Sequence, residues 1–265
     1  MPGARLAQWI DRGDAADLEI AAGQREARAA FEGWEGVDII AHPGGPREKQ
    51  LLVADMDSTM IGQECIDELA DYAGVKPEVA DITERAMQGE LDFAGALRER
   101  VALLRGLEAS VIDHCLAERI RPNAGAATLV RTIRSRGAMT VLVSGGFTAF
   151  VAPIAERIGF ERFEANVLGV EGGKLTGLTE GRLVDSRRKH DVLSEVRDSL
   201  GLQSADTLAI GDGANDIPMI EEAGLGIAYR AKPALAAVAD ARLDHHGLDA
   251  LLWAQGIPRG QWVEA

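Results

Sequence analysis

The sequence has few cysteines, no long apolar run and a deficit of positive charge. Cys65 and Cys115 are the only cysteines among 265 residues, and neither belongs to a CxxC pair. No disulfide framework is therefore predicted, and both thiols are expected to be buried and reduced. No apolar stretch reaches the length of a membrane span, and the charged N-terminal segment lacks the apolar core of a secretory signal. These absences predict a cytoplasmic protein.

Acidic residues outnumber basic ones, 42 against 28, which gives a formal net charge of −14. Such a surface repels nucleic-acid backbones and anionic membranes at long range, so neither partner is expected. It also repels a phosphate group, so any phosphate site must be locally positive. The length suits one large domain, or a core domain with a smaller insert.

Strands and helices alternate over most of the chain. Apolar runs predict strands at 51–54, 139–143, 207–210 and 225–228, and helices at 147–158, 189–200, 216–223 and 233–239. This alternation predicts an α/β fold, a Rossmann-like parallel sheet covered by helices. Five glycines within 167–181 indicate a β-hairpin in addition.

Residues 63–120 look helical and contain no convincing strand, which predicts a helical cap inserted after the first core strand. The expected division is an appendage at 1–47, a core at 48–62 and 123–265, and a cap at 63–122. Within the appendage, 15–31 suggests a helix and 37–40 a short strand. Gly62 and the segment 122–125 are candidate hinges, because the cap leaves and rejoins the core there.

Two aspartates follow the first strand directly, in the run Asp55-Met56-Asp57-Ser58-Thr59. Ligands of parallel sheets bind beyond the carboxyl ends of the strands, and an extended chain would point Asp55 and Asp57 to one side. One carboxylate could then attack while the other holds a proton for the leaving group. Taken alone, the same pattern also occurs at solvated turns and helix N-caps.

Glycine-rich turns follow two further strands. In Ser144-Gly145-Gly146, the hydroxyl and nearby N–H groups could donate to phosphate oxygens before a helix begins. The second turn contains Asp212, Asn215 and Asp216, whose oxygens suit Mg²⁺ better than a soft metal. A plain strand-to-helix turn and an Asx-rich helix cap are the alternatives for these two segments.

A fixed cation is needed beside such carboxylates, because a phosphate dianion cannot enter an acidic pocket without one. Lys189, which follows Arg187-Arg188 at the start of a predicted helix, is the candidate. A solvated helix charge is the ordinary alternative for a lysine in such a run.

In this order, DxDST, SGG after a strand, Lys and GDGxND resemble the haloacid dehalogenase superfamily of phosphotransferases, over roughly residues 48–252. Within it, the phosphoserine phosphatases are the most similar group. The similarity extends to Glu64, to the stretch 86–93, and to 97–101. Some bacterial relatives carry a regulatory domain before the core, of which residues 1–47 could be a remnant.

The resemblance implies Mg²⁺-dependent hydrolysis of O-phosphoserine, the last step of serine biosynthesis. It assigns Asp55 as the nucleophile that forms an aspartyl-phosphate and Asp57 as the acid and base. It places Mg²⁺ on Asp55, Asp57 and Asp212, supported by Asn215 and Asp216. The phosphoryl oxygens are assigned to Ser144, Gly145, Lys189 and Asn215.

The same resemblance assigns recognition of the serine part to the cap. Arg100 would grip the carboxylate and Glu64 would pair with the ammonium group. Met87 and Phe93 would form an apolar wall, with Gly146 also contacting the substrate. Judged singly, these residues could be solvated helix charges or ordinary core.

Several alternatives stay open at this point. The same chemistry could serve phosphothreonine or homoserine phosphate, or it could transfer the phosphoryl group to an acceptor alcohol. A non-catalytic phospho-ligand binding module would keep the fold, although every acidic position is present here. A homodimer is an open alternative to a monomer.

Overall fold

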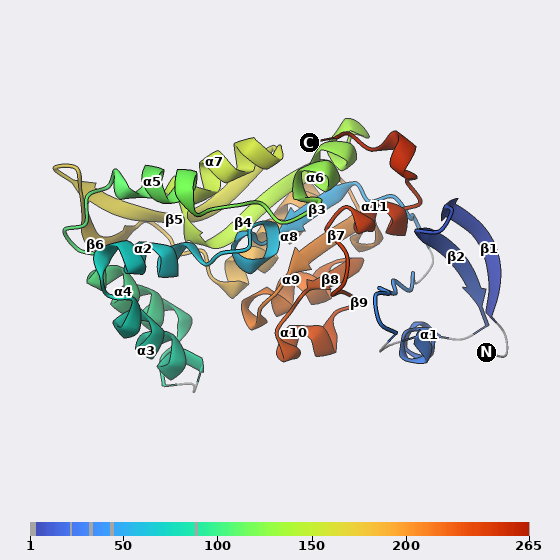
Figure 1. The fold of residues 1–265 in the computed structure, drawn as a ribbon, viewed down its shortest axis with the longest axis horizontal. Coiled ribbons are helices and arrows are strands. Elements are labelled where there is room, and N and C mark those ends of the chain that lie inside the picture. Colours follow the sequence, from blue (N-terminus) through green and yellow to red (C-terminus); the bar gives the residue numbers. More distant parts are fainter. Residues whose placement is uncertain (1–3, 22, 32–33, 43–44, 88–89, 265) are drawn as a thin grey trace.

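A computed structural model describes residues 4–21, 23–31, 34–42, 45–87 and 90–264. A seven-stranded sheet forms its centre (Figure 1), in the order β6-β5-β4-β3-β7-β8-β9. These strands are β3 (Leu51–Ala54), β4 (Met139–Phe147), β5 (Arg162–Glu171), β6 (Lys174–Glu180), β7 (Thr207–Gly211), β8 (Leu225–Tyr229) and β9 (Ala241–Leu243). Neighbouring strands are parallel except β5 and β6, which form an antiparallel hairpin. The predicted α/β class is therefore confirmed.

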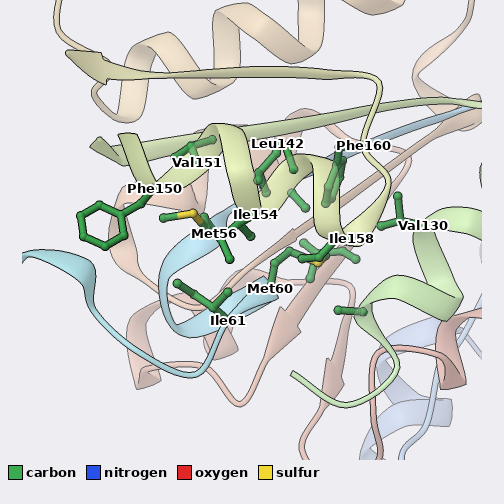
Figure 2. Close-up of a cluster of buried hydrophobic side chains, with 14 of the residues drawn as sticks. Met56, Met60, Ile61, Val130, Leu142, Phe150, Val151, Ile154, Ile158 and Phe160 are labelled. Atoms are coloured by element: carbon green, nitrogen blue, oxygen red, sulfur yellow. The ribbon is translucent and has the colours of Figure 1, made fainter. Parts of the chain in front are cut away.

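β3 occupies the middle of the sheet because it is apolar on both faces. Its four residues are completely buried, which is what an interior parallel strand requires. Alternate side chains enter different apolar clusters, Leu52 and Ala54 one and Leu51 and Val53 the other. Figure 2 shows part of the first cluster, where Met56 and Met60 lie near α7 side chains such as Ile154.

Helices cover both faces of the sheet. The first cluster includes residues of α6 (Ala126–Ser135), α7 (Thr148–Ile158) and α11 (Ala250–Ala254). The second includes residues of α8 (Ser186–Ser199), α9 (Ile217–Glu222) and α10 (Pro233–Val238). None of the helices in the described residues combines the length and apolar character that crossing a membrane requires.

Four helices lie between β3 and α6, at one end of the molecule in Figure 1: α2 (Cys65–Ala73), α3 (Lys76–Met87), α4 (Phe93–Leu103) and α5 (Val111–Glu118). The two chain segments that lead to and from them run side by side. Ile61 and Pro122 form an isolated β-bridge. Gly62 N–H donates to the Arg121 carbonyl at 3.3 Å. The two candidate hinge segments are thus tied to each other by main-chain hydrogen bonds.

The N-terminal region differs from the expected helix and strand. Residues 15–20 form a strand, β2 (Ala15–Ile20), paired with β1 (Ala4–Asp11) through a turn at Gly13, and the helix α1 (Gln24–Phe31) is shorter than expected. Helix propensity is a weak prior, and pairing with the neighbouring strand β1 overrides it here. Residues 37–40 form no strand. Instead, the Asp38 carboxylate accepts hydrogen bonds from the N–H groups of 244–246.

Candidate active site

Side chains from the carboxyl ends of β3, β4 and β7 meet at one cavity of about 220 Å³. Parallel neighbours end at the same edge of a sheet, so residues that follow them are brought together. Most of the predicted site residues line this cavity: Asp55, Asp57, Glu64, Phe93, Arg100, Ser144, Gly145, Gly146, Asp212 and Asn215. Lys189 and Asp216 are buried beside it. Met87 ends α3, and its side chain lies outside the described part of the structure.

Lys189 bridges two carboxylates beneath the cavity. Its Nζ lies 2.7 Å from Asp55 Oδ1 and 2.7 Å from Asp216 Oδ1, and the lysine is 1% exposed. Burial and the neighbouring Asp216 raise the pKa of Asp55, whereas Lys189 opposes this shift. Burial by itself would lower the pKa of Lys189, but the two carboxylates outweigh it and raise that pKa. The ammonium group therefore stays charged and favours the ionised form of Asp55.

Asp55, Asp212 and Asp216 form a buried acidic group. One carboxylate oxygen of each lies within 4.8 Å of the others. Burial raises the pKa of Asp212 to about 6. Asp216 is fixed from the other side, because its Oδ2 accepts hydrogen bonds from the N–H groups of Asp212 and Gly213 at 3.2 Å each. Three convergent hard oxygen donors are suited to Mg²⁺ or another hard divalent cation.

Asp57 also faces this cavity, but different neighbouring groups shift its pKa. Burial, followed by the nearby charge of Glu64, raises the pKa of Asp57 to about 7. Its Oδ1 is buried without a hydrogen-bond partner. A Cβ placed on Gly146 would lie 3.1 Å from Asp57 Oδ2, so glycine leaves room for this carboxyl group. A carboxyl group with a pKa near neutrality can hold a proton and release it to a leaving group.

β4 continues through the predicted phosphate-binding turn to Phe147, so Ser144, Gly145 and Gly146 belong to its end. Ser144 is 1% exposed, and its Oγ accepts a hydrogen bond from Gly146 N–H at 2.9 Å. A Cβ on Gly145 would come 3.1 Å from Phe93 Cζ. Glycine therefore lets the Phe93 side chain approach the main chain closely.

The sequence reasoning missed Asn166, a buried residue of β5. Its Nδ2 donates to the Gly145 carbonyl at 2.8 Å, and its Oδ1 accepts from Val184 N–H at 2.8 Å. Val184 precedes Asp185, the N-cap residue of the helix that carries Lys189. Asn166 thus joins the end of β4 to the start of α8. No local motif marks this role, because the contacts are made across 21 and 18 residues of chain.

Lys232 was also missed. It follows β8, lines the cavity, and places its Nζ 3.5 Å from Asp212 Oδ2. The side chain is 64% exposed, so solvent screens this pair strongly. A single lysine before a proline gives no signal in the sequence that would separate it from other surface lysines.

A larger cavity of about 470 Å³ lies between the β1–β2 hairpin and α11. Its lining is mostly apolar, with Trp9, Trp34 and Trp253 among its residues. Asp17, an acidic residue of this lining, is paired with Arg47 through two contacts of 2.6 Å. Among the described residues, the group of three carboxylates that could hold a metal ion lies at the sheet edge and not at this cavity.

Comparison with known proteins finds a matching family model and several similar proteins. The family model described as haloacid dehalogenase-like hydrolase matches residues 52–221. The chain is 45% identical over 233 residues to a phosphoserine phosphatase of Mycobacterium tuberculosis, covering 87% of this chain and 56% of that protein. It is 43% identical over 225 residues to a phosphoserine phosphatase of Archaeoglobus fulgidus, covering 84% and 65%. The chain thus spans about three-fifths of the length of these two relatives.

A solved structure described as a phospho-aspartyl intermediate analogue of phosphoserine phosphatase has the same fold. It superposes with a TM-score of 0.72 at 41% identity, over 78% of this chain and 98% of that one. The match covers nearly the whole of that shorter protein.

Proposed function

Because this chain belongs to the haloacid dehalogenase-like hydrolases, we propose that it hydrolyses O-phosphoserine to serine and phosphate through an aspartyl-phosphate on Asp55. One observation carries the proposal: Asp55 is paired with a buried lysine at 2.7 Å in the cavity that also contains Asp57. A nucleophilic carboxylate and a carboxylic acid with a pKa near 7 are the two groups that this reaction requires.

In the first step, a carboxylate oxygen of Asp55 bonds to phosphorus while the bond from phosphorus to the serine oxygen breaks. Asp57 gives its proton to the departing serine oxygen. In the second step, water attacks the same phosphorus and gives a proton to Asp57. The bond from phosphorus to Asp55 breaks, and the Asp55 carboxylate is released. Catalysis then depends mainly on positioning and on charge stabilisation.

The phosphoryl oxygens are assigned to Ser144, Gly145, Lys189 and Asn215. Lys189 supports this role because it is buried, charged and tied to Asp55. Removing one donor to such a charge should cost about 2.7–4 kcal/mol in the barrier.

Mg²⁺ is part of the proposal. Asp55, Asp212 and the Asp57 main-chain carbonyl would hold it, with Asn215 and Asp216 supporting them, and it would offset phosphoryl charge. The buried acidic group of Asp55, Asp212 and Asp216 supports this assignment, because its donors are all hard oxygens.

The cap residues are proposed to select the serine part. Arg100 would bind the substrate carboxylate and Glu64 its ammonium group, while Met87, Phe93 and Gly146 would enclose the substrate. Glu64, Phe93 and Arg100 lie on the cavity wall that the core residues complete. We also propose the division into a cap at 63–122, a core at 48–62 and 123–265, and an appendage at 1–47. Cap closure over the core would exclude water from the first step.

The test is phosphate release from a panel of phosphomonoesters, with and without Mg²⁺. Phosphoserine should be the preferred substrate, ahead of phosphothreonine and homoserine phosphate, and chelation should abolish release. Asp55→Asn should abolish turnover, whereas Asp113→Asn, a matched change at an exposed position of α5, should not. Preference for another ester would reassign the substrate, and normal turnover by Asp55→Asn would refute the mechanism.

A further inference from the structure

Ser58, directly after Asp57, has an unfavourable backbone conformation. Its φ is 55°, and Ser58 and Arg230 are the non-glycine residues with positive φ among those the structure describes. A Cβ is disfavoured in this left-handed region, which glycine adopts freely. The Ser58 N–H donates to the Gln63 carbonyl at 3.3 Å, which closes the loop into the cap. Since glycine would suit this backbone better, the serine side chain needs its own explanation.

The Ser58 hydroxyl contacts one carboxylate in the cavity wall. Its Oγ donates to Glu64 Oε1 at 2.6 Å, a short hydrogen bond of the kind formed with a charged acceptor. Glu64 is the N-cap residue of α2, but its side chain makes no capping hydrogen bond. The Glu64 carboxylate is therefore held by a residue of the core segment, and it does not cap its own helix.

This contact fixes the direction of a flexible side chain that would otherwise lose rotational freedom when a ligand binds. Within the described part of the chain, the second oxygen, Glu64 Oε2, has no protein hydrogen-bond partner. Glu64 lines the cavity together with Arg100 and Asp57. One oxygen is thus anchored, while the other is left to accept from a ligand.

We infer that Ser58 is a positioning residue for Glu64 and thereby sets the preference for phosphomonoesters that carry an ammonium group. The inference rests on the proposed function, which assigns Glu64 to the ammonium group of phosphoserine. The anchored carboxylate presents its free oxygen to the ammonium group without a further ordering cost. A substrate that lacks this group gains nothing from the anchor.

The test compares O-phosphoserine with 3-phosphoglycerate, which carries a hydroxyl where phosphoserine carries its ammonium group. In Ser58→Gly and Ser58→Ala, the ratio of kcat/KM for the two substrates should fall roughly tenfold, the scale of one hydrogen bond to a charged group. The loss should appear mainly in KM for phosphoserine. Ser58→Ala should unfold at a lower temperature than Ser58→Gly, because only alanine places a Cβ at positive φ.

Two variants separate this effect from general disruption. Both variants lack the Ser58 hydroxyl. The ratio of kcat/KM for the two substrates should therefore fall equally in the glycine and alanine variants, although their stabilities differ. In a Glu64→Gln background, Ser58→Gly should change the ratio no further, because the two residues act as one unit.

An unchanged ratio in Ser58→Gly, or an equal loss in the Glu64→Gln background, would overturn the inference while the proposed function stood. A wild-type enzyme that shows no preference for phosphoserine over 3-phosphoglycerate would overturn both. Each result is obtained on the full chain with steady-state assays and thermal unfolding.

Discussion

Lys189 is a buried cation whose two partners are also buried, so its removal should affect stability as well as activity. Lys189→Ala leaves Asp55 and Asp216 without a countercharge, a loss of about 3–5 kcal/mol in the free energy of unfolding at neutral pH. The loss should shrink as pH falls, because the raised pKa of Asp55 lets this carboxylate become neutral. Urea unfolding with chelator present measures it.

Lys232→Ala is the matched control, since this lysine also contacts an aspartate of the site but is 64% exposed. It should change the free energy of unfolding by less than about 1 kcal/mol. Equal losses in the two variants would contradict the view that Lys189 is a buried structural countercharge.

Asp57 predicts the pH dependence of the first chemical step. Its pKa of about 7 means that the proton for the proposed leaving group is present below this pH and lost above it. The single-turnover rate of phosphoenzyme formation should therefore fall as pH rises through about 7. Rapid acid quenching across this range measures that rate.

An aryl phosphate, whose leaving group needs no proton, should lose much less rate over the same range. Asp57→Asn should be slow with phosphoserine and insensitive to pH near neutrality. A rate with phosphoserine that increases through pH 7 would exclude Asp57 as the acid.

At the scale of elements, short-range patterns predicted the core strands well. Residues 51–54 were predicted as a strand and are β3, because an unbroken apolar run suits burial on both faces. The strand at 15–20 was missed, since helix propensity does not record its hairpin pairing with 4–11. A different limit applies to the site. Motifs gave Asp55, Asp57 and Asp212, whereas Asn166 acts through contacts distant in sequence.

Asn166 should determine how well β4 and α8 are aligned. Asn166→Ala leaves the Val184 N–H and the Gly145 carbonyl without their partner, which should cost about 1–3 kcal/mol in the free energy of unfolding. It should also lower kcat more than it raises KM, because the end of β4 and the helix that carries Lys189 lose their connection. Chemical denaturation and steady-state kinetics measure the two effects.

Asn166→Asp provides the control, because it keeps the acceptor for Val184 but loses the donor to Gly145. It should retain part of the stability and lose activity. If Asn166→Ala proved as stable and active as the wild type, the connection would not contribute to positioning.

At the scale of the whole molecule, the acidic group links folding to the proposed cation. Mg²⁺ bound by Asp55 and Asp212 in the folded chain should add about 2.7 kcal/mol to the free energy of unfolding at a hundredfold excess over its Kd. Thermal unfolding with increasing Mg²⁺ measures this stabilisation. Asp212→Asn, which removes one carboxylate of the group, should show a much smaller shift. Absence of any shift in the wild-type chain would argue against a cation at this group.

In the proposed reaction, a carboxylate at the end of β3 takes the phosphoryl group directly. This step is tested by quenching the enzyme with acid during turnover of radiolabelled phosphoserine and mapping the label by proteolysis and mass spectrometry. We expect an acid-stable, base-labile phosphoryl group on Asp55 that is absent from Asp55→Asn. Release of labelled phosphate with no covalent label on the protein, or with label on another residue, would contradict it.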